Sequence, residues 1–356
     1  MAGDLINILK MARPSVIMLK PYASAKEEFK NFEQDLVYLD ANENPYENGM
    51  NRYPDPNQTP LRLKISEIKG LRPDQILLGN GSDEILDMIY RVFFEPGKDS
   101  IIINTPTFGM FEVLSNINDV VCKKVLLKED FQLDIESIVA QIDRQTKAVF
   151  ICSPNNPTGN LMREEDILKL LELKLLVIVD EAYIDFSGTE SWTKRLNEFN
   201  NLIVTQTFSK AYGLAGIRLG ACYANAQIID LLKKIKMPYN VNVLTQKKAL
   251  DYISNTAIRT KEVKSILDNR TLLEKEIEGI SFVKKIYPSD SNFLLIKVDD
   301  ANKRYQELIA KGLVVRNRTK EPLCDNCLRV TVGTKEENKK LMQALFALDN
   351  PNNTKP

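Results

Sequence analysis

The chain of 356 residues contains no histidine. Within a single chain, this absence excludes a Ser-His-Asp triad, a histidine-ligated zinc centre and histidine acid–base catalysis. Proton transfer near neutral pH then has to come from lysine, carboxylate, tyrosine or cysteine side chains. Net charge is absent too, because 48 Lys and Arg balance 48 Asp and Glu. This balance argues against a nucleic-acid partner, which needs a basic excess or stripe.

Cysteine is scarce and odd in number, with five residues, which argues against a disulfide framework. Cys324 and Cys327 form a C-x-x-C pair, but no second pair and no histidine completes a zinc site. We therefore interpret them as ordinary loop thiols and expect no metal. Long apolar runs are also missing, since Asp4, Lys10 and Arg13 interrupt the N-terminal segment. We expect a cytoplasmic protein with no membrane partner.

Short β-branched apolar runs are each followed by a polar or glycine-rich turn. The five pairs of run and turn are 76–78 with 79–84, 101–103 with 105–109, 148–152 with 153–159, 175–179 with 180–183, and 202–204 with 207–218. Helical patterns such as 82–94 and 163–173 lie between them. This alternation predicts an α/β fold with a mainly parallel sheet covered by helices on both faces. Ligands of such sheets bind outside the carboxyl ends of the strands, where all five turns fall.

The chain is longer than one hydrophobic core usually supports, so we expect two lobes. After about Pro238, charged helices over 247–279 precede strands near 292–298 and 328–332, which is typical of a smaller α+β lobe. The predicted parts are an N-terminal arm at 1–35, a large domain at 36–238, a small C-terminal domain at 239–350 and a flexible tail at 351–356.

Lys210 follows one of the apolar runs directly, in a segment that ends at Arg218. Burying an ammonium is costly, and one compensation is to use the amine as a covalent handle for a carbonyl cofactor. A lysine that acts as a base near neutral pH needs its pKa lowered by roughly 3 units from about 10.4. Burial and a nearby cation such as Arg218 could supply that shift. The alternative is a surface lysine, the usual fate of this residue type.

Polar residues of two other turns suit the recognition of an aromatic ring. Asp180 ends an apolar run and can pair with a protonated pyridine nitrogen, although carboxylates after strands are also common helix caps. Asn156 and the Tyr183 hydroxyl can donate hydrogen bonds to a phenolic oxygen. Phe108 can stack on a flat ring, although a core aromatic is the default for this residue type.

The turn at 79–84 opens a helix after a strand, so its backbone N–H groups predict a phosphate seat. Ser209 and Arg218 could complete that seat. The turn lacks both the Rossmann glycine pattern and the Walker lysine, which argues against dinucleotide and NTP ligands.

Two arginines accompany β-branched runs near the C-terminus. Arg316 follows the run at 313–315, and Arg329 lies inside the run at 328–333. An arginine in such a run is partly buried and then needs an anion. An internal salt bridge would meet the same need.

Together these segments resemble the fold type I pyridoxal-phosphate-dependent aminotransferases and, within them, the histidinol-phosphate aminotransferase family. The resemblance covers nearly the whole chain. It rests on the segments 39–45, 51–56, 81–84, 153–159, 180–183, 209–210 with Arg218, and 328–333.

The resemblance implies a role for each candidate residue. Pyridoxal 5'-phosphate would be attached to Lys210, which would also be the catalytic base. The other cofactor contacts would come from Ser82, Asp83, Phe108, Asn156, Asp180, Tyr183, Ser209 and Arg218, and, across a homodimer interface, from Tyr53 to the partner's cofactor. Tyr22, Asn42, Arg316 and Arg329 would bind the substrate.

The implied reaction moves an amino group between histidinol phosphate or imidazole-acetol phosphate and 2-oxoglutarate or glutamate, a step of histidine biosynthesis. Arg316 and Arg329 would serve both substrates, because each substrate carries an anion. A threonine-phosphate decarboxylase and an aromatic amino acid aminotransferase on the same scaffold are open alternatives. A cofactor-binding regulator without catalysis is a remote one, because the segment before the main lobe has no helix-turn-helix pattern.

Overall fold

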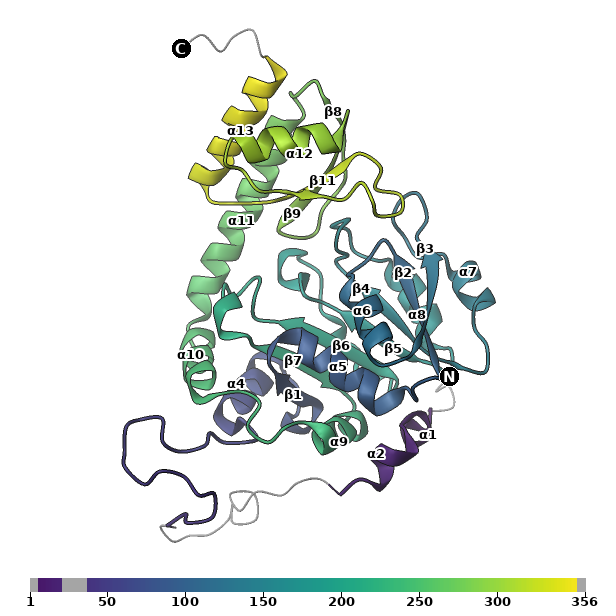
Figure 1. The fold of residues 1–356 in the computed structure, drawn as a ribbon, viewed down its shortest axis with the longest axis vertical. Helices are drawn as coiled ribbons and strands as arrows, with labels where there is room; N and C mark the ends of the chain where they lie inside the picture. Colours follow the sequence, from purple (N-terminus) through teal and green to yellow (C-terminus); the bar gives the residue numbers. More distant parts are fainter. Residues whose placement is uncertain (1–5, 21–36, 351–356) are drawn as a thin grey trace.

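The computed structural model describes residues 6–20 and 37–350. Figure 1 shows a larger part built on a seven-stranded sheet and a smaller part built on a four-stranded sheet, with helix α11 (Thr256–Ile277) running from one to the other. No helix within the described ranges combines the length and the apolar character that crossing a bilayer requires.

The seven-stranded sheet has the order β1-β7-β6-β5-β4-β2-β3. Its strands are β1 (Ile76–Gly79), β2 (Ser100–Thr105), β3 (Val121–Leu126), β4 (Thr146–Cys152), β5 (Leu176–Asp180), β6 (Leu202–Thr207) and β7 (Gly220–Ala224). All neighbouring pairs are parallel except the two that β7 makes, with β1 and with β6. The predicted mainly parallel sheet is thus confirmed, and the five predicted turns meet at one edge.

Two of these strands are not apparent from the sequence, for different reasons. β3 is an edge strand whose side chains are mostly exposed or half-buried, so it carries no continuous apolar run. β7 is fully buried but is built from glycine, alanine, cysteine and tyrosine, without a β-branched residue.

Alternate side chains along the strands feed two separate hydrophobic cores, one on each face of the sheet. One face is covered by α1 (Ile8–Met11), α2 (Pro14–Met18), α5 (Gly81–Phe93), α6 (Met110–Ile117) and α9 (Ala226–Ile235). The other is covered by α4 (Thr59–Lys69), α7 (Ile135–Ala140), α8 (Glu164–Leu171) and α10 (Val243–Ile253). The prediction of helices on both faces is confirmed.

The smaller part is an antiparallel sheet of order β10-β11-β9-β8, packed against helices. Its elements are β8 (Val283–Ile286), β9 (Phe293–Val298), β10 (Arg316–Asn317), β11 (Cys327–Thr331), α12 (Ala301–Ala310) and α13 (Lys335–Asp349), together with α11. This is the smaller α+β lobe expected from the sequence. The residue limits given for the domains stay predictions.

The C-x-x-C pair closes the turn that leads into β11. The Cys327 N–H donates to the Cys324 carbonyl at 3.0 Å, and both side chains are fully buried. The interpretation as ordinary loop thiols is therefore wrong in one respect, because both sulfurs belong to the hydrophobic core.

The N-terminus of α5 lies unusually close to β7. A Cβ added at Gly220 would lie 2.3 Å from the carbonyl carbon of Gly81 and 2.4 Å from the Ser82 nitrogen, so only glycine fits there. Gly81 itself has φ +75°, and a Cβ at that position would lie 2.8 Å from Nη2 of Arg218. This close packing places the first turn of α5 beside the carboxyl end of β6.

Candidate active site

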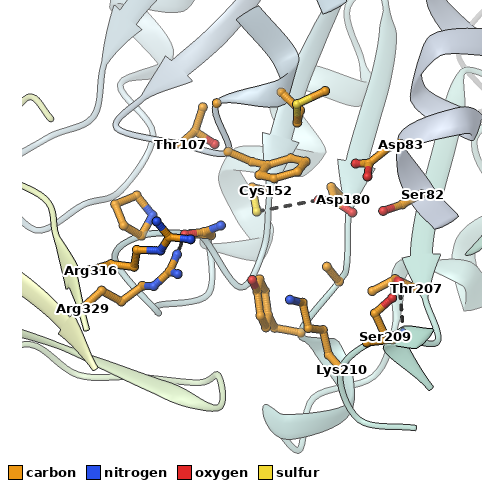
Figure 2. Close-up of a pocket in the computed structure, with 18 of the residues that line it drawn as sticks. Ser82, Asp83, Thr107, Cys152, Asp180, Thr207, Ser209, Lys210, Arg316 and Arg329 are labelled. Atoms are coloured by element: carbon orange, nitrogen blue, oxygen red, sulfur yellow. Dashed lines mark hydrogen bonds between the residues drawn. The ribbon is translucent and has the colours of Figure 1, made fainter. Parts of the chain in front are cut away.

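A cavity of about 560 Å³ opens between the carboxyl edge of the seven-stranded sheet and the hairpin of β10 and β11 (Figure 2). Most of the predicted site residues line it. They are Ser82, Asp83, Phe108, Asn156, Asp180, Tyr183, Ser209, Lys210, Arg218, Arg316 and Arg329. Residues of both sheets therefore face one space.

Two predicted residues of the described ranges are not brought into this cavity. Asn42 and Tyr53 are exposed and are not among its lining residues. They belong to the segment before α4, which extends away from the body of the molecule (Figure 1). The Tyr53 ring stacks on Tyr239, with 4.3 Å between centroids. Tyr22 lies outside the described residues.

Asp180, the last residue of β5, is only 2% exposed, and its side chain lies at the inner wall of the cavity. The Thr205 hydroxyl donates to Oδ1 at 2.9 Å, and Cys152 Sγ lies 4.0 Å from Oδ2. Burial raises the pKa of Asp180 to about 7, although the Thr205 hydrogen bond opposes the shift. No lysine or arginine of the described ranges forms an ion pair with it. A cationic group in the cavity would stabilise the charged carboxylate.

Lys210 lies just beyond β6, in a turn closed by the Gly213 N–H donating to the Lys210 carbonyl at 3.0 Å. The residue as a whole is exposed, because the cavity is open, but its ammonium faces the cavity, 5.7 Å from the ring centre of Tyr183. Desolvation lowers the pKa of Lys210, the positive charge of Arg329 lowers it further, and Asp180 opposes both. Arg218, the cation expected from the sequence, lowers the pKa of Lys210 less than Arg329 does.

Arg218 has the smaller effect because its guanidinium is directed to Ser209 and Asp83. Its Nη1 lies 3.4 Å from Ser209 Oγ, and its Nη2 lies 3.5 Å from Asp83 Oδ2. Ser82 and Asp83 belong to the first turn of α5, where backbone N–H groups have no intrahelical acceptor. A helix N-terminus, a hydroxyl and a guanidinium thus share one end of the cavity, the arrangement of a phosphate seat.

Hydrogen-bond donors and a ring lie between the two ends of the cavity. Burial raises the pKa of Tyr183, so its hydroxyl keeps its proton and can donate. The Asn156 Oδ1 accepts a hydrogen bond from Nη1 of Arg329, which leaves the amide nitrogen of Asn156 as a donor. Phe108 also lines the cavity and packs edge-on against Phe111, with 5.7 Å between centroids.

Arg316 and Arg329 occupy the opposite end of the cavity (Figure 2). They are directly opposed in the register of β10 and β11. Arg329 is half-buried, 5.2 Å from the Phe293 ring centre, and its Nε has no hydrogen-bond partner in the described part of the chain. Neither arginine forms an ion pair there, so the alternative of an internal salt bridge is not realised. The expected partial burial is wrong for Arg316, which is exposed because β10 is the edge strand of the smaller sheet. An anion in the cavity would satisfy Arg329 and could contact Arg316 as well.

The cavity is also lined by residues that were not predicted, among them the polar residues Thr107, Cys152, Thr207, Arg318 and Glu321. Thr207 ends β6, and its hydroxyl accepts from the Ser209 N–H at 3.2 Å. Thr207 and Cys152 each end a strand, and this position could have identified both as cavity residues from the sequence. Arg318 follows Arg316 by two residues, the spacing of one strand face.

Comparison with known proteins gives consistent results. The family model for class I and II aminotransferases matches residues 31–345. The histidinol-phosphate aminotransferase of Christiangramia forsetii is 56% identical over 345 residues, which cover 97% of this chain and 99% of that relative. The crystal structure of the histidinol-phosphate aminotransferase from Clostridium acetobutylicum has a TM-score of 0.79 at 26% identity, covering 85% of this chain and 92% of that one.

A further solved structure carries a ligand. The histidinol-phosphate aminotransferase from Sinorhizobium meliloti, in complex with pyridoxal 5'-phosphate, has a TM-score of 0.76 at 22% identity, covering 83% of this chain and 84% of that one. At this identity the likeness concerns the fold.

The raised pKa of Asp180 predicts how the ligand-free protein responds to pH. As pH rises from about 4 to about 7, the unfolded carboxyl loses its proton while the folded one keeps it, so folding stability falls over that window. Asp180→Asn removes this loss. We expect the ligand-free variant to be more stable than the wild type at about pH 8, by on the order of 4 kcal/mol.

Denaturant unfolding of both ligand-free proteins between about pH 5 and pH 8 measures the effect. The stability difference should shrink steadily toward the acidic end. A difference that does not change with pH would contradict a buried carboxyl with a raised pKa.

Proposed function

The chain belongs to the class I and II aminotransferases, and from this premise we propose that it transfers the amino group of glutamate to imidazole-acetol phosphate, giving histidinol phosphate and 2-oxoglutarate. The observation that carries the proposal is the single cavity that joins Lys210, the buried Asp180 and the opposed pair Arg316 and Arg329. The reaction belongs to histidine biosynthesis, and we propose a cytoplasmic location for it.

The cofactor is pyridoxal 5'-phosphate, and the residues present fit it. When bound, it supplies an aldehyde that reacts with amines and a ring that delocalises the charge left when a proton leaves the substrate carbon. The carboxylate of Asp180, which has no cationic partner within the described ranges, would lie against the ring nitrogen. The donors of Asn156 and Tyr183 would face the ring oxygen, and Phe108 would lie on the ring face.

The phosphate of the cofactor would occupy the seat at the start of α5. The Ser82 and Asp83 N–H groups, the Ser209 hydroxyl and the Arg218 guanidinium would hold it. Arg218 is already directed to this end of the cavity by Asp83 and Ser209. These groups would bind and orient the phosphate without forming a covalent bond to it.

Proton transfer is assigned to Lys210. No histidine exists in the chain, and Lys210 is the lysine that lines the cavity. Its lowered pKa increases the fraction of neutral amine, which would accept the proton of the substrate carbon at its Nζ and hold it there for return. The Asp180 carboxylate would favour a positive ring nitrogen when the cofactor is bound, and the Tyr183 ring lies beside the amine.

Anion binding is assigned to Arg316 and Arg329. Glutamate presents carboxylates and the phosphorylated substrate presents a phosphate, so one pair of guanidinium groups can receive both. The half-buried position of Arg329 strengthens its attraction for an anion, because the surroundings are less polar than water.

The proposed reaction is tested with the purified, cofactor-loaded protein, histidinol phosphate and 2-oxoglutarate. We expect glutamate to form, and we expect Lys210→Ala to lower kcat by more than about 10³-fold because the covalent and proton-transfer group is lost. Lys264→Ala is the matched control, since this lysine is 75% exposed and outside the cavity, and it should leave kcat unchanged.

Assays of the same protein with other substrates would favour the alternative functions. Release of carbon dioxide from threonine phosphate would favour the decarboxylase. A faster reaction of phenylalanine than of histidinol phosphate would favour the aromatic aminotransferase. Full activity in Lys210→Ala would contradict the assignment of the cavity itself.

We also propose that the enzyme is a homodimer in which Tyr53 completes the cofactor site of the partner. Tyr53 lies outside the cavity of its own chain. The segment that carries it displays Val37, Leu39 and Tyr46 at 82%, 86% and 81% exposure. Apolar side chains gathered on one protruding segment are typical of an interface with another chain.

Mixing two impaired variants tests this dimer. Lys210→Ala and Tyr53→Ala are each expected to be weakly active alone. After subunit exchange, half of the dimers are hybrids with one intact site, so activity should return to about a quarter of the wild-type value. Size-exclusion chromatography confirms that both variants assemble. No recovery in dimers shown to exchange would contradict a site shared between subunits.

A further inference from the structure

The hairpin that carries Arg316 and Arg329 presents a third arginine to the cavity. Arg318 is a lining residue, and its N–H donates to the Cys327 carbonyl at 2.8 Å, which extends the ladder of β10 and β11 by one step. Residues two apart on a strand share a face, and Arg316 is directly opposite Arg329. All three arginine side chains therefore leave the same face of the hairpin, toward the cavity.

This arrangement is electrostatically costly in the absence of a ligand. Like charges opposite one another across strands are destabilising. Burial lowers the pKa of Arg329, and the positive charges of Arg318 and Arg316 lower it further. The Nε atoms of Arg318 and Arg329 are both buried and have no hydrogen-bond partner among residues 6–20 and 37–350. Ion pairs within the described ranges offset only part of the positive charge of the cluster.

Within the described ranges, the carboxylate of Glu321 is the group that forms an ion pair with this cluster. Its Oε1 lies 3.5 Å from Nη1 of Arg318, and it also lines the cavity. The turn that brings it there is closed by the Glu321 N–H donating to the Arg318 carbonyl at 2.9 Å. Glu321 offsets one of the three positive charges and leaves two uncompensated.

The three arginines and Glu321 together carry a net charge of about +2, which matches a phosphate better than a carboxylate. A phosphate monoester carries about −1.5 to −2 near neutral pH and offers three acceptor oxygens, whereas a carboxylate carries one charge and two oxygens. The opposed pair Arg316 and Arg329 is sufficient for a carboxylate. A third guanidinium becomes useful when the phosphate arrives.

We propose that Arg318 is a specificity-determining residue that binds the phosphate group of the phosphorylated substrate and contributes little to the binding of glutamate. This inference rests on the proposed function, since it names a residue for one of the two substrates of that reaction. Glu321 acts as a positioning residue, because its carboxylate holds the Arg318 guanidinium at the cavity wall when no phosphate is bound.

The test compares the two substrates in the cofactor-loaded Arg318→Gln variant. We expect kcat/KM for histidinol phosphate to fall by about tenfold or more, the effect of losing one charge-assisted hydrogen bond, and kcat/KM for glutamate to change by less than about threefold. Arg318→Lys should recover part of the loss. Lys320→Gln is the matched control, because it removes the same charge from an exposed position of the same turn outside the cavity.

Inorganic phosphate gives a second readout, as an inhibitor competing with glutamate. Its inhibition constant should rise by about tenfold in Arg318→Gln and should stay equal or fall in Glu321→Gln, which keeps the arginine and removes the opposing charge. Cofactor absorbance and the thermal midpoint should match the wild type in both variants.

An equal loss for both substrates in Arg318→Gln would indicate a structural role and overturn the proposal, as would an unchanged response to phosphate. If the wild type does not turn over histidinol phosphate, the proposed function is wrong. Phosphate inhibition of the glutamate reaction still decides the role of Arg318 in that case.

Discussion

The buried carboxylate of Asp180 is the constraint around which the site is built. It ends β5, a central strand, where Cys152 of β4 and Thr205 of β6 are its partners in register. A hydroxyl and a thiol cannot neutralise it, so its pKa is raised to about 7. The cavity above it therefore favours a cation held close to the sheet, and the ring nitrogen of pyridoxal phosphate is such a group. Lys210, which follows the neighbouring strand β6, lines the same cavity and would lie beside that ring.

The two proposed anion sites lie at opposite ends of the cavity and come from different kinds of structure. At one end, the first turn of α5 and Arg218 are packed against β7 by the close approach of Gly220. At the other end, a short hairpin of the smaller sheet presents its arginines (Figure 2). The first site belongs to the large sheet and suits a permanent cofactor. The second belongs to the smaller sheet and suits substrates that exchange.

From the sequence, the predictable residues of this cavity are those that end a strand or directly follow one. Asp180 and Lys210 were identifiable because each follows an apolar run, and the sheet brings such positions together. Contacts between distant segments were not identifiable. Arg329 outweighs Arg218 beside Lys210 only because the hairpin folds back over the sheet. Likewise, the role proposed for Tyr53 would depend on a second chain, and its position outside the cavity follows from no pattern in this one.

The central claim is that Asp180 pairs with a cationic ring nitrogen. It is tested most directly by measuring the affinity of the cofactor-free protein for pyridoxal phosphate and for its analogue with C–H in place of the ring nitrogen. The account predicts that the wild type binds pyridoxal phosphate more tightly by about tenfold or more, and that Asp180→Asn loses most of this preference. Equal affinity of the wild type for both compounds would contradict it.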